Sequence, residues 1–469
     1  MNSDERISSS PYDVVIVGAG VVGCALARRF TLEGASVLVV EKCADILSGA
    51  SKGNSALLHT GYDAPEQSLE LNCIKAGYKE YIEIHKKFQL PILKTTALVV
   101  AWTEDQEQQL PAIVAKAHAN GISNVRLVNR DELIELEPEL SKKARAAVLV
   151  PDEHAIDPWS APLAYLTQAI DNGAKLQLST EINNGSFDGE FWCLNTGEKK
   201  IMCRTVINCA GLYGDILDKN LLGETSFEIR PRKGQFVVFD KIASKLMNAI
   251  ILPVPTPTTK GIVVCKTVFG NVLVGPTAEE QESRDDATVN SDTLAKLQQA
   301  AIEIIPELQG VGVTATYSGI RPATEEKDYR ISFNKDKNWI SVGGVRSTGL
   351  TAALGIASYV YKKYKRAGNL HDVIVDPTYL IMPNLAEHEK RDYIYPGNDG
   401  IVCHCELVSK REIINALNSL VPARSLQGLK RRTRATMGRC QGFYCTAELS
   451  EMTKGHFEQP IAVGKCHGK

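Results

Sequence analysis

Four cysteines near the carboxyl end of the chain are spaced closely enough to bind a metal centre together. Cys403 and Cys405 are separated by one residue, and Cys440 and Cys445 by four. Four thiolates are the number that a 2Fe-2S cluster or an all-cysteine zinc site needs. Zinc sites usually pair cysteines with two to four residues between them, so the spacing of the first two fits zinc less well. We therefore predict a metal centre at these four residues, with four free thiols as the alternative.

A glycine motif near the amino end predicts a dinucleotide site. The apolar run 12–17 is typical of a buried parallel strand, and Gly18, Gly20 and Gly23 follow it as G-x-G-x-x-G. Apolar residues then recur at helical spacing, and a second strand-like run ends at Glu41. The three glycines would permit a tight turn, close approach to a pyrophosphate, and packing of the helix on the strand. Glu41 would bind the adenosine ribose and argues against a 2'-phosphate, which leaves FAD or NAD.

Further segments favour FAD over NAD. One strand-like run ends at Ala210 and Gly211, and another ends in a glycine pair that includes Gly344 and leads into a helical pattern. A glycine pair before a helix can hold another part of an extended cofactor, as flavin enzymes need for their isoalloxazine ring. The small-residue loop 48–55 can lie close to a flat cofactor, although a solvated surface loop is the alternative. From this loop we expect Ser51, Asn54 and Ser55 at the cofactor.

The elements that must position these residues fall into separate domains. Residues 400–469 contain 11 Lys and Arg against 5 Asp and Glu, whereas the rest of the chain is acidic. A stretch rich in turn-forming residues, 395–400, precedes this basic tail. In the first 395 residues, strand-like runs alternate with helical patterns at the start, and strand-like segments dominate 225–275. These patterns predict an α/β fold: a Rossmann-like domain with an inserted antiparallel-sheet domain, followed by a small four-cysteine domain.

Composition excludes several classes of protein. The 469 residues are 44% hydrophobic and 23% charged, which is ordinary for a globular protein. A net charge of -2 gives no general basis for binding nucleic acid. The longest apolar runs are of strand length, so we expect no membrane-embedded segment, while contact with a membrane surface stays open. The polar residues 1–10 lack the features of a targeting peptide and favour a cytoplasmic protein, in which the eight scattered cysteines stay reduced.

A family resemblance runs over most of residues 12–365. It is carried by the glycine motif with Glu41 and by residues 50–55, 59–62, 231–235, 274–280, 319–322 and 346–351. With these stretches the chain resembles the FAD-dependent oxidoreductases of the D-amino-acid-oxidase type, and within them the FAD-linked glycerol-3-phosphate dehydrogenases. The resemblance implies FAD contacts at Gly349, Leu350 and Thr351.

The resemblance also implies domain limits. FAD-binding segments are expected at 11–88, 150–222 and 315–395, with the substrate domain at 89–149 and 223–314. The run 431–442 resembles the bacterioferritin-associated-ferredoxin-like domain fused to some of these dehydrogenases, which implies a 2Fe-2S domain at 396–469 in preference to zinc. The arginines of this run would offset the charge of the cluster or bind an acidic partner, with solvated helix charges as the alternative.

The resemblance places His59 beside the isoalloxazine ring. Oxidation of a secondary alcohol by flavin needs a group that removes the hydroxyl proton, and imidazole titrates near the working pH. A dianionic substrate needs cations, for which we expect Arg321 and Arg346, because guanidinium groups fit phosphate and carboxylate oxygens. The alternative for His59 is a structural histidine. The alternative for either arginine is a structural ion pair, which fits Arg346 better than Arg321. Lys260 is a further candidate cation, although a solvated loop lysine fits it better.

Together these features predict an enzyme that oxidises glycerol 3-phosphate, a phosphorylated polyol, to dihydroxyacetone phosphate. The hydride would pass to FAD, and electrons would leave through the cluster to a quinone, a soluble carrier or oxygen. One alternative is an L-2-hydroxyglutarate or other 2-hydroxy-acid enzyme on the same fold. Two more are a zinc-binding regulatory protein that only holds a nucleotide, and an electron-transfer protein with no organic substrate.

Overall fold

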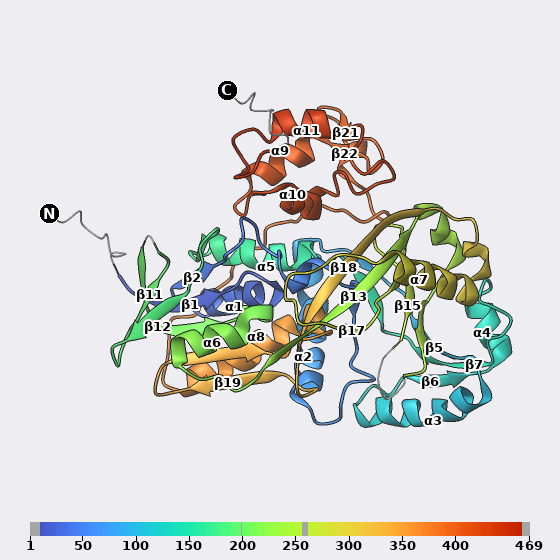
Figure 1. The fold of residues 1–469 in the computed structure, drawn as a ribbon, viewed down its shortest axis with the longest axis horizontal. Coiled ribbons are helices and arrows are strands. Elements are labelled where there is room, and N and C mark those ends of the chain that lie inside the picture. Colours follow the sequence, from blue (N-terminus) through green and yellow to red (C-terminus); the bar gives the residue numbers. More distant parts are fainter. Residues whose placement is uncertain (1–9, 198, 256–260, 462–469) are drawn as a thin grey trace.

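The computed structural model describes residues 10–197, 199–255 and 261–461 (Figure 1). Two large sheets lie side by side, and the C-terminal segment folds into a separate small domain above them. Among the described helices, none combines the length and apolar character that a membrane span requires.

The first sheet is parallel at its centre. β1 pairs in parallel with β2 on one side and with β12 on the other. β12 has two partners along its other edge: its first half pairs with β11 in antiparallel orientation, and its second half pairs with β20 in parallel. The strands are β1 (Tyr12–Val17), β2 (Val37–Val40), β9 (Lys175–Gln177), β10 (Asn184–Phe187), β11 (Trp192–Asn195), β12 (Lys200–Asn208), β19 (Arg330–Asn334) and β20 (Trp339–Gly343).

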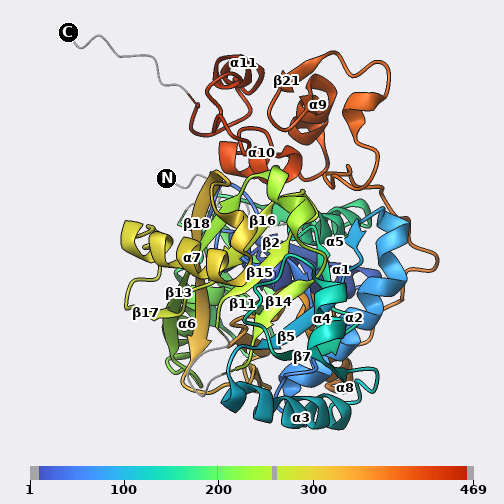
Figure 2. The same cartoon turned by 90° about the vertical axis from the view of Figure 1, so that its right-hand side faces the viewer.

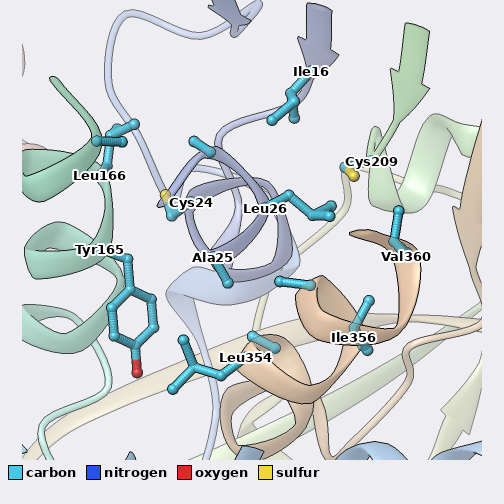
Figure 3. Close-up of a cluster of buried hydrophobic side chains, with 14 of the residues drawn as sticks. Ile16, Cys24, Ala25, Leu26, Tyr165, Leu166, Cys209, Leu354, Ile356 and Val360 are labelled. Carbon is cyan, nitrogen blue, oxygen red and sulfur yellow. The ribbon is translucent and has the colours of Figure 1, made fainter. Parts of the chain in front are cut away.

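Helix α1 is the centre of the core that covers this sheet. Figure 3 shows Leu26 of α1 among apolar side chains of α5 and α8, including Leu166 and Ile356, and all three are fully buried. α8 also packs against α2 so closely that a Cβ at Gly355 would lie 2.0 Å from the carbonyl oxygen of Cys73. The helices of this half are α1 (Val21–Leu32), α2 (Leu69–Phe88), α5 (Ser160–Asp171), α6 (Gly214–Leu222) and α8 (Gly349–Arg366).

The second sheet is mostly antiparallel and is built from two separate parts of the chain. Its strands are β5 (Ala97–Ala101), β6 (Arg126–Val128), β7 (Ala146–Val150), β13 (Ile229–Phe239), β14 (Ile250–Pro253), β15 (Val263–Lys266), β16 (Val272–Gly275), β17 (Glu279–Glu280) and β18 (Val313–Thr324). One pair differs from the expected antiparallel sheet: β5 and β14 are parallel. These two strands come from different segments, so no short hairpin sets their direction.

Both faces of the second sheet are covered by helices. Along β5, Leu98 contributes to a cluster that includes side chains of α4 (Arg130–Leu136) and α7 (Ser291–Ile304). Val99 points to the opposite face and packs in a cluster with α3 (Glu104–Ala119). β18 pairs with β13 as far as Thr324, so this sheet runs past residue 314, where the second substrate segment was expected to end. The division of the chain into segments otherwise stays a prediction.

The C-terminal domain has its own apolar core. It contains β21 (Ile401–Cys403), β22 (Val408–Ser409), α9 (Lys410–Asn418), α10 (Leu426–Thr433) and α11 (Thr446–Met452). Ile413 of α9, Leu429 of α10 and Leu449 of α11 are buried together. The view in Figure 2 shows α10 on the side of this domain that faces the remainder of the molecule.

Candidate functional site

The glycine loop after β1 has the shape that a dinucleotide requires. Gly18 has a φ of +107°, and a Cβ there would lie 2.6 Å from the carbonyl oxygen of Cys209. A Cβ at Gly23 would lie 1.9 Å from the carbonyl oxygen of Gly18, so only glycine lets α1 pack here. At Gly20 a Cβ would meet only the Oγ atom of Ser51, at 3.2 Å. The backbone at the start of α1 is therefore open to a ligand, as a pyrophosphate needs.

Glu41 follows β2 and ties the glycine loop to the next segment. Its Oε2 atom accepts a hydrogen bond from the backbone N–H of Ala19 at 2.8 Å, and its Oε1 atom accepts one from Cys43 at 2.9 Å. Each carboxylate oxygen can accept a second hydrogen bond. The role expected for Glu41 at a ribose is thus compatible with a role in holding the loop.

A cavity of about 380 Å³ opens beside this loop. Of the residues expected at the cofactor, those that line it are Gly18, Gly20, Glu41, Ser51, Asn54, Ser55, Ala210, Gly211, Gly344, Gly349 and Leu350. Gly23 and Thr351 are not among its lining residues. Thr351 instead accepts a hydrogen bond from the backbone N–H of His59 at 3.0 Å. Residues from five parts of the chain therefore converge on one cavity, and the fit to an extended dinucleotide rests on this convergence and on the open backbone at Gly20.

His59 lies just after β3 (Leu57–Leu58) and is held by a buried carboxylate. Its Nδ1 atom is 2.8 Å from Oε2 of Glu153, which is 1% exposed. The other oxygen of Glu153 accepts hydrogen bonds from the backbone N–H and the hydroxyl of Thr60. β3 pairs with β8 (His154–Ile156), which follows Glu153 directly and fixes it beside the histidine. His59 itself is not among the lining residues of the cavity.

Arg321 and Arg346 both line the cavity. Arg321 donates from Nη2 to the carbonyl oxygen of Thr277 at 3.0 Å, and the Nε atom of Arg346 is buried without a hydrogen-bond partner in the described chain. Burial and the neighbouring Arg232 and Arg346 lower the pKa of Arg321 to about 10. Within residues 10–197, 199–255 and 261–461, neither guanidinium forms the ion pair that was considered as an alternative. Lys260 lies outside the described residues.

The four cysteines of the C-terminal domain come together as two pairs. The thiols of Cys405 and Cys440 lie close enough to shift each other's pKa, and the thiol of Cys403 likewise raises the pKa of Cys445. Neighbouring backbone amides, that of Tyr444 first, lower the pKa of the Cys440 thiol, which favours the thiolate that binds metal. No group of three His, Cys, Asp or Glu side chains in the described chain is arranged tightly enough to hold a metal ion. The donor set is four thiols in one small fold, as a 2Fe-2S cluster requires.

The arginines near these cysteines make contacts that the sequence did not predict, while their expected role of offsetting the charge of the cluster stays a prediction. Arg431, Arg432 and Arg434 are buried, so they are neither solvated charges nor open to an acidic partner. Arg432 pairs with Asp45 of the first domain at 2.9 Å. The fourth arginine of this run, Arg439, is largely exposed, and it pairs with Asp240 of the second sheet's domain. The sequence did not reveal this because each partner carboxylate lies far away along the chain.

Glu153 and Asp45 are two buried carboxylates of the site region that the sequence did not predict. Glu153 lies in a polar turn, and Asp45 in the loop between β2 and the 3-10 helix η1 (Ala50–Lys52). Both segments have the composition of solvent-exposed turns, so no periodicity or motif distinguishes these buried carboxylates. The scattered cysteines within the described chain are free thiols, and most of them are buried.

Two family models match the chain. Residues 13–362 match the FAD dependent oxidoreductase model, and residues 401–454 match the BFD-like 2Fe-2S binding domain. The glycerol 3-phosphate dehydrogenase of Caloramator mitchellensis is 30% identical over 97% of this chain and 98% of its own length. The glycerol 3-phosphate oxidase of Mycoplasma pneumoniae is 30% identical over 73% of this chain and 92% of its own length. A solved structure of L-alpha-glycerophosphate oxidase from Mycoplasma pneumoniae with FAD bound is 26% identical, with a TM-score of 0.75 over 80% of this chain and 100% of that chain.

Proposed function

This chain belongs to the FAD dependent oxidoreductase family, and from that premise we propose that it oxidises glycerol 3-phosphate to dihydroxyacetone phosphate. The chain binds FAD and a 2Fe-2S cluster. When bound, FAD accepts the hydride that leaves the carbinol carbon. The residues of the chain bind the substrate, hold it in position and take up the hydroxyl proton.

The observation that carries the proposal is the pair of guanidinium groups at the cavity. Arg321 and Arg346 meet there close enough to repel each other, and the hydrogen bond of Arg321 goes to a neutral carbonyl. Both side chains are partly buried, and neither forms an ion pair with a carboxylate among the described residues, although Glu280 attracts Arg321 from further away. Two partly buried cations held together in this way are costly unless an anion joins them. A phosphate dianion supplies two negative charges and several acceptor oxygens, which match the planar guanidinium groups.

His59 is proposed as the base that takes the hydroxyl proton. The contact between Nδ1 and Glu153 favours the tautomer with the proton on Nδ1, which makes Nε2 the atom that accepts the substrate proton. Glu153 is buried and is held in turn by Thr60. This arrangement fixes the imidazole orientation, as a base that acts on a positioned substrate requires.

The proposed FAD contacts are the residues expected from the sequence. They are Gly18, Gly20, Gly23, Glu41, Ser51, Asn54, Ser55, Ala210, Gly211, Gly344, Gly349, Leu350 and Thr351. Cys403, Cys405, Cys440 and Cys445 are proposed as the cluster ligands. We further propose that single electrons leave through the cluster to a quinone, a soluble carrier or oxygen, and that the enzyme works in the cytoplasm.

One experiment separates this function from its alternatives. The purified protein is mixed anaerobically with glycerol 3-phosphate, and in parallel with L-2-hydroxyglutarate, while the flavin absorbance is followed. Rapid bleaching with glycerol 3-phosphate alone supports the proposal. Bleaching with the hydroxy acid alone would assign the enzyme to 2-hydroxy acids. Zinc without iron in the metal analysis, or no flavin response to either compound, would overturn the assignment as a dehydrogenase.

A further inference from the structure

The C-terminal domain contacts the loop that lines the FAD cavity. Ser48, Gly49, Ala50, Ser51 and Lys52 line the cavity, and residues 45–47 lead directly into them. We call residues 45–52 the cofactor loop. Its position decides where these lining residues meet a bound dinucleotide.

On one side, the cofactor loop is fixed to the glycine motif. The backbone N–H of Leu47 donates to the carbonyl oxygen of Ala19 at 3.0 Å. The Oγ atom of Ser51 accepts a hydrogen bond from the backbone N–H of Val21 at 3.0 Å. Leu47 also has a φ of +58°, a conformation that a non-glycine residue holds only when its surroundings stabilise it.

On the other side, helix α10 holds the cofactor loop through a buried carboxylate. Asp45 accepts hydrogen bonds from Nη2 of Arg432 and from the backbone N–H of Arg424, both at 2.9 Å. A Cβ at Gly428 of α10 would lie 1.6 Å from Oδ2 of Asp45, so the helix backbone lies directly against this carboxylate. Asp45 is 1% exposed, and Arg432 is buried. The contact is therefore a buried charged pair to which solvent has little access.

A second arginine of α10 holds the next residues of the loop. Arg431 donates from Nη2 to the carbonyl oxygen of Ile46 at 2.8 Å, and Nη2 also lies 3.5 Å from Oγ of Ser48, which lines the cavity. Arg431 is 7% exposed. A buried guanidinium that binds a loop carbonyl fixes the loop more firmly than an exposed one, because water cannot replace the lost contact.

The far end of the loop is reached through two aromatic rings. The guanidinium of Arg434 lies over the ring of Phe269, 4.1 Å from its centroid. Phe269 stacks on Trp159 with 5.4 Å between ring centroids, and Nε1 of Trp159 lies 3.4 Å from the carbonyl oxygen of Lys52. The arginines at the end of α10 thus contact or approach the cofactor loop at both of its ends.

We propose that the four-cysteine domain is a structural part of the FAD site: α10 holds the cofactor loop in its binding conformation, and loss of this contact weakens FAD binding. Because coupling between two sites is reciprocal, bound FAD must in turn stabilise the four-cysteine domain and its cluster. The proposal rests on the FAD assignment of the family and is independent of the substrate. It can therefore fail while the proposed function stands, and it can hold even if the substrate is not glycerol 3-phosphate.

The test measures release of FAD from the purified holoenzyme after dilution, followed by flavin fluorescence, with iron content determined in the same samples. The variants are Arg431→Met, which removes the contact to Ile46, and Asp45→Asn, which removes the charge that pairs with Arg432. Arg424→Gln is the matched control, because the Arg424 side chain is exposed and only its backbone N–H binds Asp45. Coupling between sites commonly changes affinity roughly 5- to 150-fold, and we expect a change of that size in both loop variants and less than about twofold in the control.

A second measurement needs no substitution. In the wild-type chain, iron release to a chelator is timed with and without excess FAD, and FAD release is timed before and after removal of the cluster. We expect excess FAD to slow iron release, and removal of the cluster to speed FAD release. Unchanged FAD release in Arg431→Met with full iron content, or iron release that is indifferent to FAD, would overturn the proposal.

Discussion

Replacing Arg321 with methionine should stabilise the protein. Burial and the neighbouring Arg232 and Arg346 hold the pKa of Arg321 at about 10, well below the ordinary value for arginine. Each pKa unit is worth about 1.4 kcal/mol, so keeping this charge costs the folded protein on the order of 3 kcal/mol. The cost applies in full below about pH 10 and is relieved only as the pH rises through that value. Loss of the hydrogen bond to Thr277 should lower the free energy of unfolding by about 1 kcal/mol. The variant should therefore be more stable than wild type by about 2 kcal/mol.

The same substitution should impair the reaction. A hydrogen bond to a charged group contributes about 1.5–3 kcal/mol, so loss of one such contact to the phosphate lowers kcat/KM by about 10- to 150-fold. Glycerol carries no phosphate, and its weaker oxidation should be unaffected by Arg321→Met. The assay is anaerobic flavin reduction over a range of concentrations of each compound, with Tm measured on the same preparations.

Arg230→Gln is the matched control for this experiment. Arg230 lies in β13, which pairs with the strand of Arg321, but its side chain is 60% exposed and pairs with Glu228. We expect this variant to keep the wild-type kinetics and Tm. The reasoning is refuted if Arg321→Met lowers Tm while the preference for glycerol 3-phosphate over glycerol is unchanged, because the arginine would then be structural.

Three further predictions concern other parts of the molecule. Glu153→Gln should slow flavin reduction by about 10²-fold because the imidazole of His59 loses its orientation. His154→Gln is the control, because His154 follows Glu153 directly but its Nδ1 atom contacts the carbonyl oxygen of Thr95, and its rate should stay close to wild type. Cys440→Ser should abolish the iron–sulfur absorbance and the reduced-state EPR signal, whereas Cys265→Ser, at a buried thiol of the second sheet, should keep both. Burial raises the pKa of Glu137 to about 7, so its contribution to stability is full below about pH 4.5 and is lost as the pH rises through 7. Glu137→Gln should therefore flatten the fall in Tm between about pH 5 and pH 8.

Each of these predictions has a clear contrary result. Equal rates for Glu153→Gln and wild type would remove the carboxylate from the chemistry. Retention of iron at full occupancy in Cys440→Ser would remove this cysteine from the ligand set. An unchanged pH dependence of Tm in Glu137→Gln would mean that another group titrates in that range.

The sequence predicted the local parts of the fold well. β1, α1 and β2 lie where the apolar runs and the glycine motif indicated, because neighbouring residues determine this βαβ unit. The FAD domain and the four-cysteine domain were both anticipated, and the family matches confirm them. In contrast, the parallel pairing of β5 with β14 joins strands about 150 residues apart, and no short-range pattern encodes it.

The site was predictable where a residue type alone suggests its chemistry. Arg321 and Arg346 line one cavity with the glycine loop, as their types suggested. The buried partners were not predictable in this way. Asp45 and Glu153 lie in turn-like sequence, and only the three-dimensional structure brings Arg432 and His59 to them. The arginines of α10 look like solvated charges in the sequence because their partners lie near the amino end of the chain.

The order of strands in the first sheet affects how a newly made chain can fold. β1 is synthesised first, but one of its two neighbours, β12, begins at residue 200, and β20 beside it begins at residue 339. Pairings of such long sequence separation form slowly, and the exposed edges of a half-built sheet can pair with other chains. We therefore expect that chains truncated before α8 aggregate instead of forming a stable fragment, and that the full chain depends on chaperones while it is being synthesised.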